Sequence, residues 1–197
     1  MRKIVAGLFI SLDGVYEAPD EWHFPYFNDE MGQSVDAQME ASDAMLLGRV
    51  TFEEFASYWP SQTPEENDIA AYMNGTRKYV VSQTLKDASA WDNSTLVTGD
   101  IAAELKKLKQ RPGKNIGITG SGTLVRSLLR DGLLDELVLL VHPIAVGHGK
   151  RLFPEGTDRI PLELVGAKTF STGVLELTYR RAAKTGDAAA AAEVTSA

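Results

Sequence analysis

A buried strand, a glycine turn and a helix follow one another without interruption in the segment Ile118-Thr119-Gly120-Ser121-Gly122-Thr123-Leu124. The apolar run 115–119 predicts a strand, and the leucine-containing run 123–131 predicts a helix that stops at Gly132. Such a junction directs unpaired backbone N–H groups and the positive end of a helix dipole towards one point, which favours an anion, usually a phosphate. A plain tight turn is the alternative, because glycine marks turns of every kind.

Two widespread phosphate motifs do not fit this turn. The Rossmann fingerprint requires a third glycine where this chain has Val125, and no acidic residue caps the next strand. The Walker motif also fails, because Gly149-Lys150 is followed by Arg151 rather than by Ser or Thr. A phosphate held at this turn therefore belongs to another kind of nucleotide fold.

Composition narrows the range of functions. The chain has 197 residues with 44% apolar content, enough for one well-buried domain. Its net charge of -7 argues against a nucleic-acid partner, and no apolar run reaches membrane-spanning length. The absence of cysteine excludes disulfides, thiolate metal sites and a cysteine nucleophile, and fits a cytoplasmic protein. We expect no metal, because His23, His142 and His148 lack metal-ligand spacing.

Strands and helices alternate along most of the chain. Apolar runs predict strands at 4–10, 44–47, 78–82, 95–98, 115–119 and 136–142. Helices are expected through 31–39, from a capping box of Thr51 and Glu54 to Pro60, over 65–74, from the cap Asp100 to Arg111, and over 123–131. This alternation predicts a mostly parallel α/β sheet with helices on both faces.

The C-terminal part has a different pattern. Runs 162–170 and 174–181 have no helix between them, so we expect an antiparallel hairpin and hence a mixed sheet. Residues 183–197 are rich in alanine and lack apolar periodicity, which predicts a disordered tail after one domain spanning 1–182.

A second strand-to-helix junction is Gly48-Arg49-Val50-Thr51. It combines a glycine, a helix start, a hydroxyl and a guanidinium, which suits bidentate contact with a phosphate. A surface arginine before an N-cap threonine is the alternative. Ser82 and Thr84 follow a third strand, so all three junctions are expected at one edge of the sheet, where two phosphates of one ligand could bind.

The long loop after the first strand carries further candidates. Asp13 could donate a proton or anchor a substrate, or it could simply bond to the backbone of its own turn. Trp22, Phe24, Tyr26 and Phe27 could stack on a flat heterocycle or pack as a hydrophobic staple for the next helix. Asp29 and Glu30 begin that helix, where acids are favoured for dipole reasons alone.

Five segments in this order resemble those of a known family. They are Ser11-Leu12-Asp13-Gly14, the run from Leu47 to Glu53, Val81-Ser82-Gln83-Thr84-Leu85, the glycine turn, and the stretch from Asp135 through His142-Pro143 to Phe153. Together they resemble the dihydrofolate reductase-like superfamily, and within it the reductase (C-terminal) domain of the bifunctional riboflavin-biosynthesis deaminase–reductase. The similarity covers about residues 2–182.

The resemblance implies a dihydrofolate reductase-like three-layer fold and an NADPH-dependent reductase related to the 5-amino-6-(5-phosphoribosylamino)uracil reductase. It places phosphate on Gly48, Arg49 and Thr51, with Arg49 a candidate for the 2′-phosphate. Ser82 and Thr84 would lie near the adenosine. The pyrophosphate would lie on the turn formed by Gly120, Ser121, Gly122, Thr123 and Leu124.

Asp13 matches an aspartate associated with substrate binding and catalysis in that family. The loop with Trp22, Phe24 and Phe27, together with Glu30, would contact the substrate. The family often forms dimers, and residues 137–141 and 143–153 could contribute to a homodimer.

Three departures limit the resemblance. The deaminase half and its zinc ligands are absent, the aromatic loop lacks basic residues that would grip a ribose phosphate, and Asp29 and Glu30 only roughly match the folate-type acid. The expected substrate is therefore a small pteridine- or pyrimidine-like heterocycle. A non-catalytic nucleotide- or pterin-binding regulatory protein on the same fold is the alternative.

Overall fold

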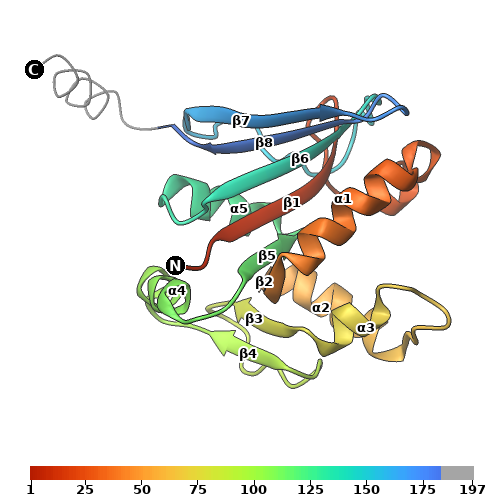
Figure 1. Ribbon diagram of the computed structural model, residues 1–197. Helices are drawn as coiled ribbons and strands as arrows, with labels where there is room; N and C mark the ends of the chain where they lie inside the picture. The colour runs from red at the N-terminus through yellow and green to blue at the C-terminus, as the bar shows by residue number, and fades with distance from the viewer. Residues whose placement is uncertain (183–197) are drawn as a thin grey trace, which may run out of the picture.

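The computed structural model describes residues 1–182, which form one eight-stranded sheet flanked by helices (Figure 1). The strands are β1 (Ile4–Ser11), β2 (Ser42–Gly48), β3 (Arg77–Val81), β4 (Ser94–Val97), β5 (Asn115–Thr119), β6 (Glu136–His142), β7 (Leu162–Thr169) and β8 (Leu175–Arg181). The helices are α1 (Asp29–Glu40), α2 (Arg49–Tyr58), α3 (Ala70–Gly75), α4 (Ile101–Gln110) and α5 (Gly122–Arg130), with 3-10 turns η1 (Pro19–Glu21), η2 (Phe24–Tyr26) and η3 (Trp59–Ser61). No helix in this part of the chain is long and apolar enough to cross a bilayer. The predicted tail 183–197 lies outside the described residues.

The strand order is β4-β3-β2-β5-β1-β6-β8-β7. In this spatial order, the first six strands, from β4 at the edge to β6, are mutually parallel. Strand β8 pairs antiparallel with both β6 and β7. The expected mixed sheet and C-terminal hairpin are therefore confirmed. Because β5 and β6 flank β1, the crossover through α5 passes over β1, and the carboxyl ends of the parallel strands all lie at one edge of the sheet.

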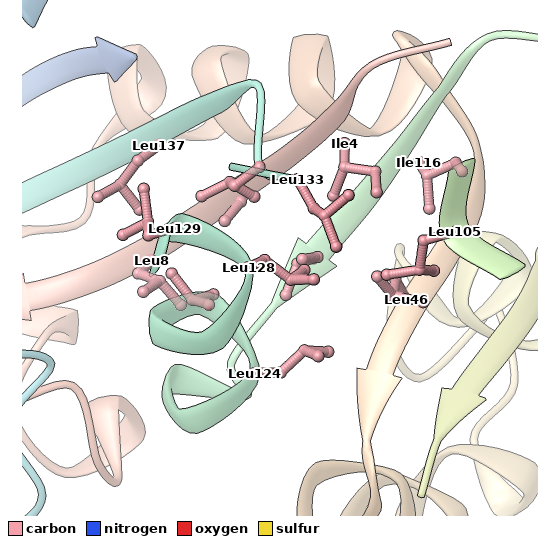
Figure 2. Packing of buried hydrophobic residues seen from close by; sticks show 14 of the residues in the cluster. Ile4, Leu8, Leu46, Leu105, Ile116, Leu124, Leu128, Leu129, Leu133 and Leu137 are labelled. Atoms are coloured by element: carbon pink, nitrogen blue, oxygen red, sulfur yellow. The ribbon is translucent and has the colours of Figure 1, made fainter. Parts of the chain in front are cut away.

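Alternate residues of the central strands build two separate layers. On one face, the even-numbered residues of β1 from Ile4 to Ile10 pack with side chains from α4 and α5. Figure 2 shows Leu124, Leu128 and Leu129 of α5 in this layer, beside Leu8 and Leu137 of the sheet. Each such fully buried leucine contributes about 1.5–3 kcal/mol of hydrophobic stabilisation, so this layer holds the α5 glycine turn in place.

The opposite face carries α1, α2 and α3 (Figure 1), and its apolar residues form two clusters rather than one. Phe52, Trp59 and Met73 from the helices α2, η3 and α3 pack on Met45 and Leu47 of β2. Met31 of α1 packs instead on Val138 and Leu140 of β6 and on the turn of the β7–β8 hairpin. A cavity separates the two clusters above the central strands.

Two predicted helix limits are wrong. Only Ala70–Gly75 of the run 65–74 is helical, because the preceding residues form turns closed by the carbonyl of Thr63 and the side chain of Asn67. Helix α2 begins at Arg49 with Gly48 as its N-cap, so Thr51 is not a cap. Its hydroxyl instead accepts a hydrogen bond from the backbone N–H of Ser121.

Residues 137–141, which we expected to contribute to a dimer surface, lie inside the sheet, and the dimer itself stays a prediction. These residues belong to β6, which pairs with β1 on one side and with β8 on the other. Leu137, Val138, Leu139 and Leu140 are buried within the protomer. The apolar run therefore reflects a strand covered on both faces, which is the usual reason for such a run in a parallel sheet.

Candidate active site

The two glycine junctions contact each other at the carboxyl edge of the sheet, because β2 and β5 are neighbouring strands. The hydroxyl of Ser121 accepts a hydrogen bond from Gly48 N–H (3.0 Å), and Ser121 N–H donates to Thr51 Oγ1 (3.1 Å). Ser121 adopts a left-handed conformation with φ of 55°, which is costly for a residue other than glycine. The two hydrogen bonds compensate for that cost and lock the two junctions together.

Close approach of the junctions requires glycine at position 120. Gly120 has φ of 66°, and a Cβ atom there would lie 3.2 Å from Thr51 Cγ2. Neither α2 nor α5 has a side chain capping its N-terminus. Two helix starts with open backbone N–H groups therefore lie side by side, which is the arrangement that favours phosphate groups.

Arg49 and Thr123 are exposed at the first turns of these helices, while Leu124 is buried in the core beneath them. The Arg49 guanidinium is 2.7 Å from the Glu53 carboxylate and remains half-exposed, so it is available to an incoming anion. Contact of Arg49 with a 2′-phosphate stays a prediction.

Ser82 and Thr84 lie where β3 ends, at the same edge. The buried Ser82 hydroxyl accepts hydrogen bonds from the N–H groups of Thr84 and Leu85, so it shapes the turn after the strand. Thr84 is exposed. Contact of Ser82 and Thr84 with an adenosine stays a prediction. The exposed Thr84 side chain is accessible for that contact, whereas the Ser82 hydroxyl is already used within the turn.

Asp13 joins the loop after β1 to the loop after β6. Its carboxylate accepts hydrogen bonds from the Ser11 hydroxyl (2.6 Å), from Val146 N–H (3.0 Å), from Gly147 N–H (2.9 Å) and from Arg151 Nη2 (3.2 Å). Arg151 Nε also donates to the Asp13 carbonyl oxygen (3.0 Å).

These donors, led by the Ser11 hydroxyl, hold the pKa of the Asp13 carboxyl well below its usual range. A carboxylate that stays ionised is unsuited to donate a proton. The geometry gives Asp13 a part in positioning the loop, and its predicted catalytic role stays a prediction.

Tyr16 follows this clamp and is absent from the sequence-based candidates. Its ring lies against Gly122, the first residue of α5, so tightly that a side chain at 122 would collide with it. The Tyr16 N–H donates to the Lys150 carbonyl oxygen (3.0 Å), so both clamped loops hold the ring in place. Only the smallness of Gly122 hints at this contact in the sequence.

The aromatic loop is folded over the end of the sheet. Trp22 is buried at 7% exposure and donates from Nε1 to the Glu17 carbonyl oxygen, whereas Phe24 remains 63% exposed. His23 stacks on Phe9 of β1 with 4.6 Å between ring centroids. The Trp22 ring thus supports the loop from inside, and only Phe24 and Phe27 keep the open faces that a predicted substrate contact needs.

Glu30 is bound to the β7–β8 turn. Its carboxylate accepts hydrogen bonds from the hydroxyl and N–H of Ser171, and a third from the side chain of Asn28. These hydrogen bonds, led by the Ser171 hydroxyl, lower the pKa of Glu30. The structure therefore gives Glu30 a role in joining α1 to the hairpin, and its predicted substrate contact stays untested.

His142 lies fully buried at the end of β6. Its Nδ1 is 2.8 Å from the Leu140 carbonyl oxygen, and its ring packs edge-on against Trp22, Phe9 and Tyr26. Burial lowers the pKa of His142, and also that of the adjacent His23.

The cavity between the two clusters has a volume of about 620 Å³. Gly7 of β1 and Gly117 of β5 line it at the sheet, and Thr119 lines it at the carboxyl end of β5. Isolated glycines inside strands indicate a close approach of another group. They are the sequence signal that could have located this cavity.

The strand order, with paired glycine junctions beside a cavity, is that of a dihydrofolate reductase-like fold. The model of the RibD C-terminal domain matches residues 2–175, and the chain belongs to that family. It is 33% identical over 182 residues to the uncharacterized protein YyaP of Bacillus subtilis, covering 90% of this chain and 94% of the relative.

Solved structures show the same fold. A putative riboflavin biosynthesis protein from Shewanella superposes with a TM-score of 0.72 at 21% identity, covering 92% of this chain and 99% of the other. Dihydrofolate reductase from Enterococcus faecalis, solved with NADP(H), superposes with a TM-score of 0.62 at 15% identity, covering 92% and 97%. The resemblance and the fold expected from the sequence are therefore confirmed.

Proposed function

We propose that the protein is an NADPH-dependent reductase of a small pteridine- or pyrimidine-like heterocycle. The observation that carries this proposal is the position of Thr119, which lines the cavity and immediately precedes the glycine turn at Gly120. A reductase of this kind needs a nicotinamide and a substrate ring in contact. A substrate in the cavity and a cofactor on the glycine turn would meet at the end of β5.

The residues present fit a dinucleotide. The uncapped starts of α2 and α5 would hold its pyrophosphate, and the exposed guanidinium of Arg49 would hold a 2′-phosphate. The ring of Tyr16, fixed against Gly122, would border the nicotinamide. When bound, NADPH supplies a hydride for the reduction.

The protein's own groups would orient the two rings and exclude water from between them. The clamp of Asp13 and Arg151 keeps Tyr16 beside the glycine turn. The lowered pKa of the Asp13 carboxyl favours another group as the source of the proton that completes the reduction.

Titration with NADPH and NADH, followed by cofactor fluorescence, tests the cofactor assignment. A panel of pterins, folates and pyrimidines, with NADPH oxidation as the readout, tests the reaction. NADPH binding with oxidation supports the proposal. Binding without turnover of any heterocycle favours the non-catalytic alternative, and a folded protein that binds neither nucleotide overturns the cofactor assignment.

We also propose that the protein acts in the cytoplasm as a homodimer. Leu164, Val165 and Leu175 of the β7–β8 hairpin are exposed, and β7 is the edge strand of the sheet. An exposed apolar edge strand favours pairing with another chain. Sedimentation analysis of the wild type and of Leu164→Lys tests this, since the variant should shift the protein towards the monomer.

A further inference from the structure

A second pocket lies at the amino edge of the sheet, where β2, β3 and β4 begin, opposite to the edge that carries the glycine turn. Its volume is about 330 Å³. Among residues 1–182, its lining contains two arginines, Arg2 and Arg77, but a single acid, Asp43. The rest of the wall consists of Ala44, Gly75, Thr76, Asn93 and Pro112. A polar pocket with two guanidinium groups suits an anion.

An irregularity in β2 places the acid of this pocket. The register of β2 against β5 shifts between Ser42 and Ala44, which leaves Asp43 as an extra residue on its strand. Such a bulge redirects a side chain. The Asp43 carboxylate accepts hydrogen bonds from the Arg2 guanidinium and, on its other oxygen, from Lys114 N–H (3.0 Å). Both carboxylate oxygens are therefore used within the protein, and Arg2 balances the charge of Asp43.

Arg2 is held rigidly, but part of its guanidinium stays available to a ligand. Its side chain is only 5% exposed. Nε donates to the Lys114 carbonyl oxygen (2.6 Å) and Nη2 donates to Asp43, whereas Nη1 has no hydrogen-bond partner within the described residues. Gly113 permits this packing, because a Cβ atom there would lie 3.1 Å from Arg2 Cζ. Arg2 thus offers a fixed hydrogen-bond donor to the pocket rather than a net charge.

The net charge comes from two other cations. Arg77, the first residue of β3, is exposed and forms no ion pair in the part of the chain that the structure describes. Lys78 is fully buried, and its Nζ donates to the carbonyl oxygens of Asn74 (3.0 Å), Thr76 (2.9 Å) and Asp92 (3.1 Å). Over residues 1–182, no carboxylate lies within ion-pair distance of this ammonium. Buried charges are normally paired, so Lys78 lacks a counter-ion in contact.

The groups that would repel an anion are already satisfied. Carbonyl oxygens at the end of a helix carry partial negative charge, and α3 ends at this pocket. The Asn74 carbonyl oxygen accepts hydrogen bonds from Lys78 Nζ and from Asn93 Nδ2 (3.1 Å). Burial lowers the pKa of Lys78 to about 8, with the Asp92 charge acting in the opposite direction. An anion in the pocket would favour the charged form of Lys78 and so offset the effect of burial.

We infer that this pocket is a second ligand site, which binds the phosphate group of a small monoester. Arg77 and Arg2 Nη1 would donate hydrogen bonds to the phosphate. Lys78 would attract it by charge alone, because carbonyl groups already use its three N–H bonds. A phosphate group is much smaller than about 330 Å³, and the mostly polar wall suits a short hydroxylated body attached to it. This ligand goes beyond the proposed reductase function and does not depend on it.

NMR spectra of the backbone amides test the site directly. The protein is titrated at constant ionic strength with glycerol 3-phosphate, inorganic phosphate and glycerol, so that screening stays equal. The ester should shift the amides of Thr76, Arg77 and Asn93 with a dissociation constant of about 1 mM or lower. Inorganic phosphate should bind the same place about threefold or more weakly, because it lacks the hydroxylated body, and glycerol should not bind.

Three results of this titration would overturn the inference. They are an ester that shifts none of these amides, shifts confined to the glycine turn, and equal or tighter binding of inorganic phosphate at the pocket. Because the amides report each edge of the sheet separately, phosphate bound at the proposed cofactor site does not obscure the result.

Variants then identify the donors. Arg77→Ala should weaken the ester about tenfold or more, and Arg77→Lys should weaken it less, because lysine keeps the charge but not the planar fork. Arg2→Lys should also weaken binding, since it removes Nη1. The matched control is Arg159→Ala, which removes an exposed arginine near β7, the opposite edge strand of the sheet, and should keep the wild-type affinity.

Thermal unfolding shows whether each variant folds. Arg77 is exposed, so Arg77→Ala should unfold at nearly the wild-type temperature and remains informative even if Arg2→Lys fails to fold. A folded Arg77→Ala protein that binds the ester as tightly as the wild type would overturn the assignment. Its NADPH affinity should be unchanged, because the glycine turn lies at the other edge. Failure of the wild type to bind NADPH would reject the proposed function and leave the ester titration decisive for this pocket.

Discussion

The ring of Tyr16 lies against the α-carbon of Gly122, so that a Cβ atom at position 122 would stand 2.6 Å from Tyr16 Cε1 and 2.8 Å from its phenol oxygen. Tyr16 comes from the loop after β1, and Gly122 begins α5 after β5. These strands are neighbours in the sheet, which brings the loop onto the glycine turn. The contact therefore couples the position of the loop to the proposed cofactor site.

Gly122→Ala should destabilise the fold by about 1–3 kcal/mol, because the added methyl group overpacks the contact. It should also weaken NADPH binding, because the displaced tyrosine moves against the turn. Adding Tyr16→Ala removes the clash, so the loss of stability in the double variant should be smaller than the sum of the single losses. Urea unfolding of the four proteins measures this coupling, and strict additivity would contradict the contact.

Asp13→Asn should lower turnover and stability together, because it weakens the clamp that positions Tyr16. The pKa of Asp13 is lowered in the folded protein, so its stabilising effect is present above the unfolded pKa of about 3.9 and is lost as pH falls through the lower folded value. The deficit of the variant in urea unfolding should thus shrink in strong acid.

The pH profile of turnover distinguishes between a role of Asp13 in clamping the loops and a role as a proton donor. A clamp leaves the shape of the profile between about pH 5 and about pH 8 unchanged in Asp13→Asn, because the carboxylate is ionised throughout that range. Disappearance of a titrating limb in the variant would restore Asp13 as a proton donor. Arg151→Lys, which keeps the charge, should retain more turnover than Arg151→Ala.

Arg49→Ala should weaken NADPH binding about tenfold and leave NADH binding nearly unchanged, since only NADPH carries the 2′-phosphate. The matched control is Glu53→Gln, which removes the charge 2.7 Å from the guanidinium without removing the arginine. That control should bind NADPH at least as well as the wild type. Equal weakening of both nucleotides by Arg49→Ala would contradict the 2′-phosphate assignment.

The buried histidines should make the aromatic loop sensitive to acid. Burial lowers the folded pKa of both His23 and His142, with Asp20 acting in the opposite direction on His23. The unfolded chain then binds more protons below about pH 6.5, so stability falls on acidification through that range. The Trp22 ring lies 5.2 Å from that of His142, so its fluorescence should change as the loop loosens.

His142→Asn keeps a donor for the Leu140 carbonyl but cannot titrate. It should be less stable than the wild type at neutral pH and should lose less stability between about pH 7 and about pH 5. Trp22→Phe separates the signal of this loop from that of Trp59 and Trp91. An identical pH dependence in wild type and His142→Asn would rule out a contribution from His142.

Local sequence signals predicted the parallel strands and the hairpin well. The strands 115–119 and 136–142 have the predicted bounds. Strands buried on both faces appear in a sequence as uninterrupted apolar runs, so their ends are easy to locate. Asp100 caps α4 as expected, through a hydrogen bond from Ala103 N–H to its carboxylate. The prediction of a helix over 65–74 was only half right, because residues 65–69 lie in turns and only the second half of the run is helical.

Candidate residues at strand ends were also predictable, since parallel topology gathers strand ends at one edge. What each side chain does there was not. Thr51 looks like a helix cap, but it accepts a hydrogen bond from Ser121, seventy positions away. Asp13 looks like a catalytic acid, but its carboxylate also accepts hydrogen bonds from Val146 and Gly147 of the loop after β6.

The sequence by itself determined the order and type of the elements, the glycine turn and the family, because these depend on local periodicity, on turn residues and on motif order. Only the tertiary structure decided the contact of Tyr16 with Gly122, the clamp on Asp13 and the cavity above Gly7 and Gly117. These features depend on distances between segments far apart in the chain, which the packing of helices on the two faces of the sheet alone determines.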